Sequence, residues 1–363
     1  MKIDQKLLKI MGLVAGSFIL LIIIIALVSG CTKNKKYSLG EAEAKIISLA
    51  KKYYQSNDSS LPRDGENTTL SVGHFISEGK IKSLRLTSGE DCTGEVVISN
   101  NNGYYLYVPK LTCGTDIKPQ TLYSKLTEEN NLVTTGPGLY KYGSSFLYRG
   151  DVINNYVSFA DKNWQIIKIN PDNSIRIIEA KKSETTKWDD RYNLDKNTYS
   201  GINDFIINNN NSRIKDRLEE AYKNSELYTD DQRAYFVKQD LCVGKRNETD
   251  TINDGSIECS DVLKDQMFGL VTVNEYLTAS LDANCKDITS PSCTNYNYLA
   301  NLPSTIWTLT ADKSSSYKVY KLSGSLSLSN ASGTSGIAVV AHLSKEVLYQ
   351  SGTGTENDPF ILK

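Results

Sequence analysis

Residues 164–178 read WQIIKINPDNSIRII, and this stretch decides the fold of the larger part of the chain. Its two apolar runs, 164–169 and 174–178, are rich in isoleucine, whose branched side chain favours strands. The Asn-Pro-Asp-Asn sequence at 170–173 favours a turn, because proline presets φ and Asp or Asn satisfies nearby backbone groups. The pattern predicts two strands joined by a turn in a β core.

Further short apolar runs on both sides extend this predicted β core. They are separated by Gly, Ser, Asn and Asp, as expected of strands between turns. The runs are Phe146–Tyr148 and Tyr156–Phe159 before the turn, and Trp307–Thr310, Tyr317–Leu322, Leu326–Leu328 and Ile337–Leu343 after it.

Helices are expected between these two groups of strands. Residues 212–223 have apolar positions at helical spacing. Thr229 with Gln232, and Thr272 with Glu275, have the capping-box spacing, in which the two side chains satisfy free backbone N–H groups at a helix start. Strands and helices together predict an α+β domain over residues 145–363.

Residues 32–116 predict a smaller α+β module. Ser38 and Glu41 form another capping box, and helical apolar spacing continues to about Gln55. A second short helix, broken by Gly79, is expected at 72–81. Strands at 95–99 and 104–108 then flank an Asn-Gly pair, which readily adopts the positive φ of a hairpin turn.

The first 31 residues predict a membrane anchor. Lys2, Lys6 and Lys9 precede an uncharged apolar run at 10–28, which ends in the small residues Val-Ser-Gly before Cys31. This arrangement resembles a bacterial lipoprotein signal, in which Cys31 becomes the lipid-attached first residue. The run of 19 residues also approaches the roughly 20 that span a bilayer as a helix, so an uncleaved transmembrane anchor remains the alternative.

The other six cysteines indicate on which side of the membrane the chain after Cys31 lies. They fall into near neighbours, Cys92 with Cys113, Cys242 with Cys259, and Cys285 with Cys293. None has the Cys-x-x-Cys spacing typical of zinc sites. Disulfides persist in oxidising surroundings, so local pairing places the chain after Cys31 on the extracytoplasmic side. Six reduced thiols are the alternative.

Composition agrees with an anchor followed by two globular domains. The chain has 363 residues, 39% of them hydrophobic, and a net charge of -1. The lysines are interleaved with Asp and Glu, which argues against nucleic acid as a partner. Residues 117–144 lack a sustained apolar period and are expected to be a linker, so the predicted division is 1–31, 32–116, 117–144 and 145–363.

Two resemblances add to this interpretation. Residues 32–116 resemble pseudopilin-type modules of Gram-positive surface proteins, on the initial helix, the stretch HFISEGKI at 74–81 and the cysteine-bracketed hairpin. The Gly-Phe-Thr-Leu-Ile-Glu type of processing site before the apolar helix is missing, which weighs against filament assembly.

Residues 145–363 contain, in order, the motifs NWQIIKI (163–169), FGLVTVNEY (268–276), WTLT (307–310), YKVY (317–320) and GIAVV (336–340). On these motifs the segment resembles an uncharacterised domain common in surface proteins of gut Firmicutes. The resemblance implies a C-type-lectin-like fold, shared with formylglycine-generating enzymes, although the usual Arg-Pro near the end is Ala-Val at 338–339.

The sequence does not predict an enzyme. Its two histidines, His74 and His342, lie outside the motifs that support nucleophilic or zinc chemistry. The acidic pairs at 189–190 and 230–231 are expected to be solvated caps and turns rather than acid–base pairs. No catalytic residue, metal ligand or cofactor site is assigned.

The sequence therefore predicts a membrane-anchored extracellular protein that binds a ligand or partner without catalysis. The long polar segments Glu184–Asn211 and Lys245–Asp261 are expected to form the binding surface, because loops on a rigid scaffold commonly carry recognition. The expected partners are membrane lipid, through the anchor, and an extracellular ligand or protein. The alternative is a minor pilin-like subunit that assembles into a surface filament or secretion system.

Overall fold

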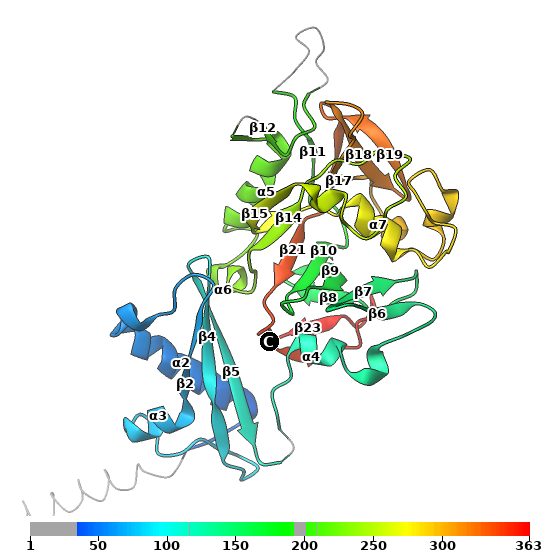
Figure 1. The fold of residues 1–363 in the computed structure, drawn as a ribbon. Helices are drawn as coiled ribbons and strands as arrows, with labels where there is room; N and C mark the ends of the chain where they lie inside the picture. The colour runs from blue at the N-terminus through cyan, green and yellow to red at the C-terminus, as the bar shows by residue number, and fades with distance from the viewer. Residues whose placement is uncertain (1–34, 116, 192–200, 208) are drawn as a thin grey trace, which may run out of the picture. The chain divides into compact units, whose positions relative to one another are not determined.

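The computed structural model describes residues 35–115, 117–191, 201–207 and 209–363 (Figure 1). The expected anchor at 1–31, with Cys31, lies outside the described residues. Among the residues that are described, no helix is both long and apolar enough to cross a membrane. The described chain forms two compact units, one drawn from 35–58, 69–96 and 109–118, the other from 59–68, 97–108 and 119–363.

The first unit is organised around α2 (Leu39–Gln55). The expected capping box is present at its start, where the Glu41 N–H donates to Ser38 Oγ and the Ser38 N–H donates to Glu41 Oε2. The helix buries one stripe at helical spacing, including Ala42, Ile46 and Ala50. Short elements accompany it, namely β1 (Lys36–Tyr37), β3 (Arg85–Leu86) and α3 (Val72–Ser77). The short helix η1 (Asp58–Ser60) lies where the chain passes from the first unit to the second.

A three-stranded sheet contributes residues to both units. Its order is β2-β4-β5, with β2 (Asn67–Ser71), β4 (Cys92–Asn101) and β5 (Tyr104–Cys113). The predicted hairpin turn is present, with positive φ at Asn102 and Gly103. The Cys92–Cys113 disulfide joins the far ends of the two hairpin strands.

The second unit contains a nine-stranded sheet. Its main path is β16-β21-β10-β9-β8-β23-β22, while β7 pairs with β9 and β6 pairs with β7. The strands are β6 (Gly138–Tyr142), β7 (Ser145–Arg149), β8 (Tyr156–Phe159), β9 (Lys162–Ile169), β10 (Ile175–Glu179), β16 (Phe268–Gly269), β21 (Val340–Leu343), β22 (Tyr349–Ser351) and β23 (Phe360–Leu362).

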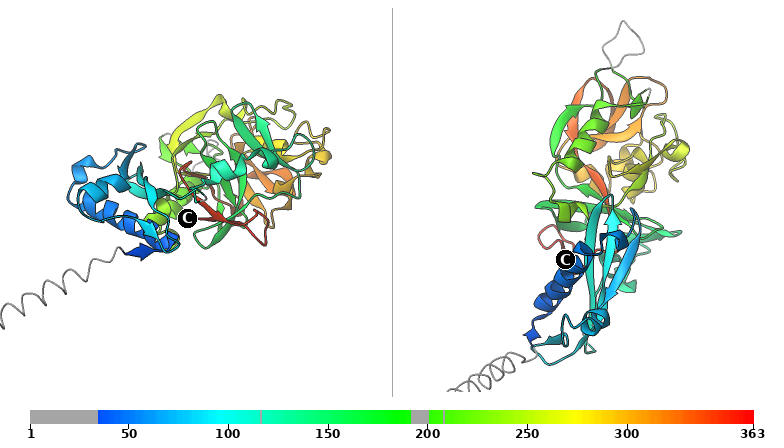
Figure 2. Two further views of the ribbon diagram at one scale, coloured as in Figure 1. Left: turned by 90° about the horizontal axis from the view of Figure 1, so that it is seen from below. Right: turned by 90° about the vertical axis from the view of Figure 1, so that its left-hand side faces the viewer.

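A five-stranded sheet, β11-β20-β17-β18-β19, lies at one end of this unit, as both Figure 1 and Figure 2 show. Its strands are β11 (Glu184–Lys187), β17 (Ile306–Ala311), β18 (Lys318–Ser323), β19 (Ser325–Asn330) and β20 (Thr334–Ile337). The remaining strands form two short pairs, β12 (Ile206–Ile207) with β13 (Asn210–Asn211) and β14 (Gln239–Cys242) with β15 (Val262–Gln266).

Short helices connect these strands. They are α4 (Leu122–Leu126), α5 (Arg213–Lys223), α6 (Asp230–Arg233), α7 (Val273–Ala279), η2 (Glu129–Asn131), η3 (Glu258–Ser260), η4 (Pro291–Thr294) and η5 (Tyr298–Asn301). The two capping boxes predicted in this unit are both present, at the starts of α6 and α7.

The predicted turn at 170–173 does join two central strands, β9 and β10. Every residue of β10 is buried, because other strands pair along both its edges and both its faces are covered. Trp164, Trp188 and Trp307 are fully buried, and the indole N–H groups of Trp164 and Trp307 donate to backbone carbonyls. These tryptophans therefore belong to the core.

The predicted fold class is wrong. Of the described residues, 37% are in β structure and 21% in helices, so the described part of the protein is mainly β rather than the predicted α+β. The predicted membrane helix lies outside the described residues. The helices in the described part of the chain are short and connect the strands, and among them only α2 exceeds 11 residues. Capping boxes predict where a helix starts, but they do not predict its length.

Two further expectations are corrected in the second unit. The expected linker 117–144 contains α4 and β6, and β6 pairs with β7 over its whole length, so this segment belongs to the larger sheet. The run expected as one strand at 337–343 is divided between β20 and β21, which belong to different sheets. Apolar character alone does not show where a strand changes sheets.

Candidate ligand pocket

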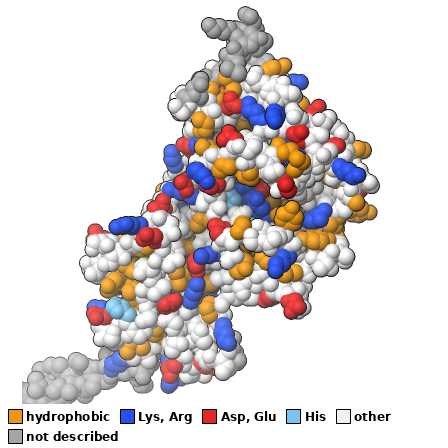
Figure 3. Space-filling view, viewed as in Figure 1, with side chains coloured by type: hydrophobic (Ala, Val, Ile, Leu, Met, Phe, Trp, Pro, Cys, Tyr) orange, Lys and Arg blue, Asp and Glu red, His pale blue; other side chains and the backbone are white. Residues whose placement is uncertain are grey.

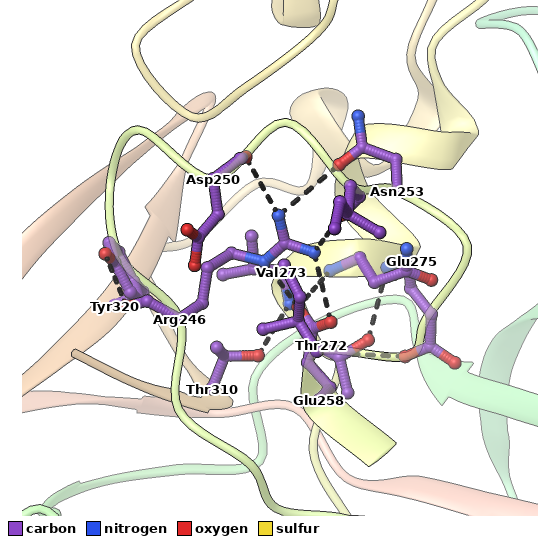
Figure 4. Close-up of polar contacts among 12 residues, drawn as sticks. Arg246, Asp250, Asn253, Glu258, Thr272, Val273, Glu275, Thr310 and Tyr320 are labelled. Atoms are coloured by element: carbon purple, nitrogen blue, oxygen red, sulfur yellow. Dashed lines mark hydrogen bonds and ion pairs between the residues drawn. The ribbon is translucent and has the colours of Figure 1, made fainter. Parts of the chain in front are cut away.

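Two segments were predicted to form a binding surface. One of them, 245–261, forms a loop that is fixed by a disulfide at its base and by a buried arginine in its interior. The disulfide between Cys242 and Cys259, which are 17 residues apart in sequence, closes its base. Arg246 is fully buried inside the loop (Figure 4). Its guanidinium donates to the carbonyl oxygens of Asp250 and Ile252, at 3.2 and 2.8 Å.

Glu258 supplies the countercharge for Arg246. The Nε and Nη2 groups of Arg246 donate to the two carboxylate oxygens of Glu258 at 2.9 and 3.1 Å. Glu258 Oε1 also accepts the backbone N–H of Asn274 at 3.0 Å, which ties the loop to the start of α7. Because a buried charge is costly unless it is paired and hydrogen-bonded, this pair fixes the loop in one arrangement.

The start of α7 also holds a second buried carboxylate. Glu275 accepts the backbone N–H of Thr272, as the capping box predicts, through Oε2 at 2.9 Å. The same carboxylate lies against Arg176 of β10, with Arg176 Nε 2.5 Å from Oε1 and Nη2 3.1 Å from Oε2. Burial acts to raise the pKa of Glu275, but Arg176 and Lys168 outweigh it and the pKa is lowered.

Arg176 is the middle member of a row of basic residues that crosses three neighbouring strands. In the register of the sheet, Arg176 faces Lys168 of β9 on one side and His342 of β21 on the other. Arg176 Nη1 lies 3.1 Å from His342 Nε2. Burial and then the charges of Arg176 and Lys168 hold the pKa of His342 well below its ordinary value, so the ring is neutral and accepts from Arg176.

Lys168 is the least satisfied member of this row. Its Nζ lies 3.6 Å from Glu275 Oε1, just beyond hydrogen-bonding distance, and among the described residues this is its sole ion-pair partner. The side chain is 32% exposed. Desolvation lowers the pKa of Lys168 and Arg176 lowers it further, while Glu275 opposes them.

These groups surround a cavity of about 220 Å³. Its walls come from β6 and β7, from Lys168 and Arg176 of the sheet, from α7 and from the Cys242–Cys259 loop. Tyr142 and Leu147 supply apolar surface, and Tyr142 is 58% exposed. The sheet and the paired carboxylates form a fixed frame, so the cavity can receive a small molecule without rearrangement of the core.

A larger and more open hollow of about 770 Å³ also lies in the second unit. Its charged wall includes Lys162, which pairs with Glu179 at 2.5 Å and donates to the Tyr228 hydroxyl at 3.3 Å. Glu179 in turn accepts the backbone N–H of Val339. The charges of this pair are satisfied by the fold, whereas Lys168 in the smaller cavity retains unused hydrogen-bonding capacity.

The other predicted site residues lie elsewhere. The segment 184–211 contributes β11, β12 and β13, and its residues 192–200 and 208 lie outside the part that the structure describes. The acidic pair at 189–190 is held by Arg191 and Arg213, and Asp230 pairs with Arg233, so these carboxylates stabilise local structure. His74 lies in α3 of the first unit, edge-on to Tyr53.

The six predicted disulfide cysteines are paired as their spacing suggested. The bonds are Cys92–Cys113, Cys242–Cys259 and Cys285–Cys293. Three disulfides are consistent with an extracellular protein. Within the described parts of the chain, no group of three or more His, Cys, Asp or Glu side chains is placed to hold a metal ion.

Sequence reasoning missed Lys168 and Arg176 as parts of a pocket, and it included Glu258 only as one residue of the segment 245–261. A usable signal was present, because Lys168 stands between Ile167 and Ile169, and Arg176 between Ile175 and Ile177. A charge inside an apolar strand must find a partner or line a cavity.

Comparison of the chain with protein families, curated proteins and solved structures found no match. The resemblance to a surface-protein domain therefore stays a prediction.

Proposed function

We propose that this protein is a membrane-anchored, extracytoplasmic binding module and that the cavity beside Lys168 is its ligand site. The apolar segment at 10–28 followed by Cys31 supports the anchor, whether that segment is cleaved and lipidated or retained. The three disulfides support an oxidising location for both units.

The observation that carries this proposal is the construction of the cavity wall. A loop closed by a disulfide is fixed from within by Arg246 and Glu258, and the same Glu258 is bonded to α7. Such a wall loses little conformational freedom when a ligand arrives, and preorganisation of this kind favours binding.

Binding accounts for the chemistry of the cavity better than catalysis does. Glu258 and Glu275 are each paired with a buried arginine and also accept a backbone N–H, so both carboxylates serve the structure of the wall. A general acid or base must instead exchange a proton at the working pH. Asp254, at the exposed rim, accepts from the backbone and hydroxyl of Ser256, which lowers its pKa.

Thermal-shift measurements on the full chain in detergent test this proposal. The probes are defined classes of small molecules, namely carboxylates, inorganic phosphate, neutral monosaccharides and amines. In Ser145→Trp, the new indole enters the cavity wall, whereas Lys141→Trp changes an exposed position of β6 outside that wall.

At least one class is expected to raise the melting temperature of the wild type and of Lys141→Trp, but not of Ser145→Trp. If every class leaves the wild type unchanged, or acts equally on both variants, the cavity is not the ligand site.

A further inference from the structure

We infer that the cavity binds a small organic carboxylate, with the ammonium group of Lys168 as the anchoring cation. This inference rests on the proposed function and names the ligand class of the same site. Three properties of the cavity carry it: the hydrogen bonds left unmade in its wall, its balance of charge, and its size.

The first property is an excess of donors. Lys168 Nζ offers three donors, yet its sole ion-pair partner among the described residues is Glu275 at 3.6 Å. The oxygens of Glu275 are already occupied by Arg176 and by the Thr272 N–H. In the same wall the buried side-chain amide nitrogen of Asn274 has no acceptor. The unused donors of the wall are therefore complementary to a ligand with oxygen atoms that accept hydrogen bonds.

The second property is the charge left after internal pairing. Arg176 is paired with Glu275, and Asp240 with Lys264 at 2.6 Å. Glu258 is likewise paired with Arg246, so Lys168 is the cation that remains available. Asp254 also remains at the exposed rim, so the wall offers one available cation beside one acidic group. This balance suits a monoanion better than a phosphate dianion, which would need further donors and would be repelled more strongly by Asp254.

The third property is the size and apolar part of the cavity. A volume of about 220 Å³ is below the roughly 300–1,000 Å³ typical of sites for drug-sized ligands, so the cavity suits a small molecule or the terminal residue of a chain. Leu147 faces Lys168 in the sheet register, so an apolar side chain lies beside the cation. This pairing suits a carboxylate attached to a short apolar group.

The position of Lys168 is only partly compensated within the protein, because Glu275 at 3.6 Å is its ion-pair partner. Directly opposed like charges on neighbouring strands repel, and Lys168 faces Arg176. A bound carboxylate would supply the countercharge and hydrogen bonds that Glu275 leaves incomplete.

Two variants of Lys168 and one control variant test the assignment. Lys168→Met keeps the length of the side chain and removes its charge, while Lys141→Met is the control at an exposed position outside the cavity. Because the unfavourable row is relieved, Lys168→Met is expected to stay folded, which circular dichroism will verify. Lys168→Arg keeps a cation and is expected to retain part of the affinity.

Isothermal titration calorimetry on the detergent-extracted full chain uses four probes: propionate, N-acetylalanyl-alanine, its C-terminal amide and inorganic phosphate. Propionate represents a free small acid, and the dipeptide represents a peptide C-terminus. Binding of either carboxylate, with at least about a tenfold loss in Lys168→Met and no loss in Lys141→Met, is expected. The amide is expected not to bind.

The other outcomes separate the two proposals. In one outcome the carboxylates do not bind, but phosphate, a sugar or an amine does, and Ser145→Trp abolishes that binding. This outcome overturns the proposed ligand class and leaves the proposed binding function in place. Equal carboxylate affinity in Lys168→Met and wild type overturns the role of Lys168. Binding of no probe, in calorimetry and in the thermal-shift panel alike, overturns both proposals.

Discussion

Buried arginines hold the cavity wall together at the scale of single residues. Arg246 is fully buried and Arg176 is 4% exposed, and each is paired with a glutamate that also bonds to the start of α7. One short helix is thus tied both to the loop and to the sheet. Removal of either glutamate would leave a buried arginine without its countercharge, which is costly.

Glu258→Gln is expected to destabilise the second unit by about 3–5 kcal/mol, because it leaves Arg246 as an uncompensated buried charge. The control Glu248→Gln changes an exposed carboxylate in the same loop and should stay within about 0.5 kcal/mol of wild type. Urea unfolding followed by tryptophan fluorescence measures the difference, since all three tryptophans lie in this unit. Similar midpoints for the two variants would show that the pair does not fix the loop.

His342 makes stability depend on pH. Its pKa is depressed in the folded state, mainly by burial and also by Arg176 and Lys168, from an ordinary value of 6.5. Below that pH the unfolded chain binds a proton that the folded chain does not, so stability falls as pH falls, by up to about 1.4 kcal/mol per unit.

His342→Gln keeps an acceptor for Arg176 and is expected to flatten this dependence between pH 6.5 and the lower folded-state pKa. Urea unfolding at several pH values measures the difference between variant and wild type. A wild type and a variant with parallel pH profiles would mean that His342 does not titrate in this way.

At the scale of elements, local signals predicted where strands and helices begin. The turn at 170–173, the Asn-Gly hairpin and the capping boxes at Ser38, Thr229 and Thr272 all depend on neighbouring residues, so the sequence displays them directly. Sheet membership depends on partners far along the chain. The change of sheet between β20 and β21 and the inclusion of β6 were therefore not predictable from local pattern.

The Cys242–Cys259 disulfide is expected to support ligand affinity at the cavity as well as the stability of the fold. Replacing both cysteines with alanine removes a 17-residue closure, which is worth about 3 kcal/mol, and loosens the loop. Ligand affinity at the cavity should then fall. The matched variant lacks Cys92 and Cys113, which lie in the other unit, and should lose stability there while keeping the affinity. Unchanged affinity without the loop disulfide would show that loop rigidity plays no part in binding.

For the molecule as a whole, surface charge is mixed. Lysine, arginine, aspartate and glutamate side chains are interleaved over the face shown in Figure 3. This distribution matches the near-neutral net charge of -1 in the sequence. Composition could suggest such a surface, but it could not locate the cavity, whose wall combines residues from 142 to 278.

The binding and assembly interpretations differ in what they predict for the size of the particle. A binding module is expected to be monomeric in detergent, whereas a pilin-like subunit would associate through residues 10–55. Size-exclusion chromatography with light scattering distinguishes them. A monomer over a wide concentration range supports binding, and concentration-dependent oligomers that dissociate when residues 10–55 are removed would favour assembly.

The central claim is that an oxidised, extracytoplasmic chain presents a cavity walled by a disulfide-closed loop. Its most direct test is mass spectrometry of the membrane-extracted protein, with free thiols alkylated before proteolysis and without reduction. We predict linked peptides for Cys92–Cys113, Cys242–Cys259 and Cys285–Cys293. The intact mass will also show whether the chain starts at a lipidated Cys31 or retains the preceding segment. Free, alkylated Cys242 and Cys259 would contradict both the location and the fixed loop on which the proposed function depends.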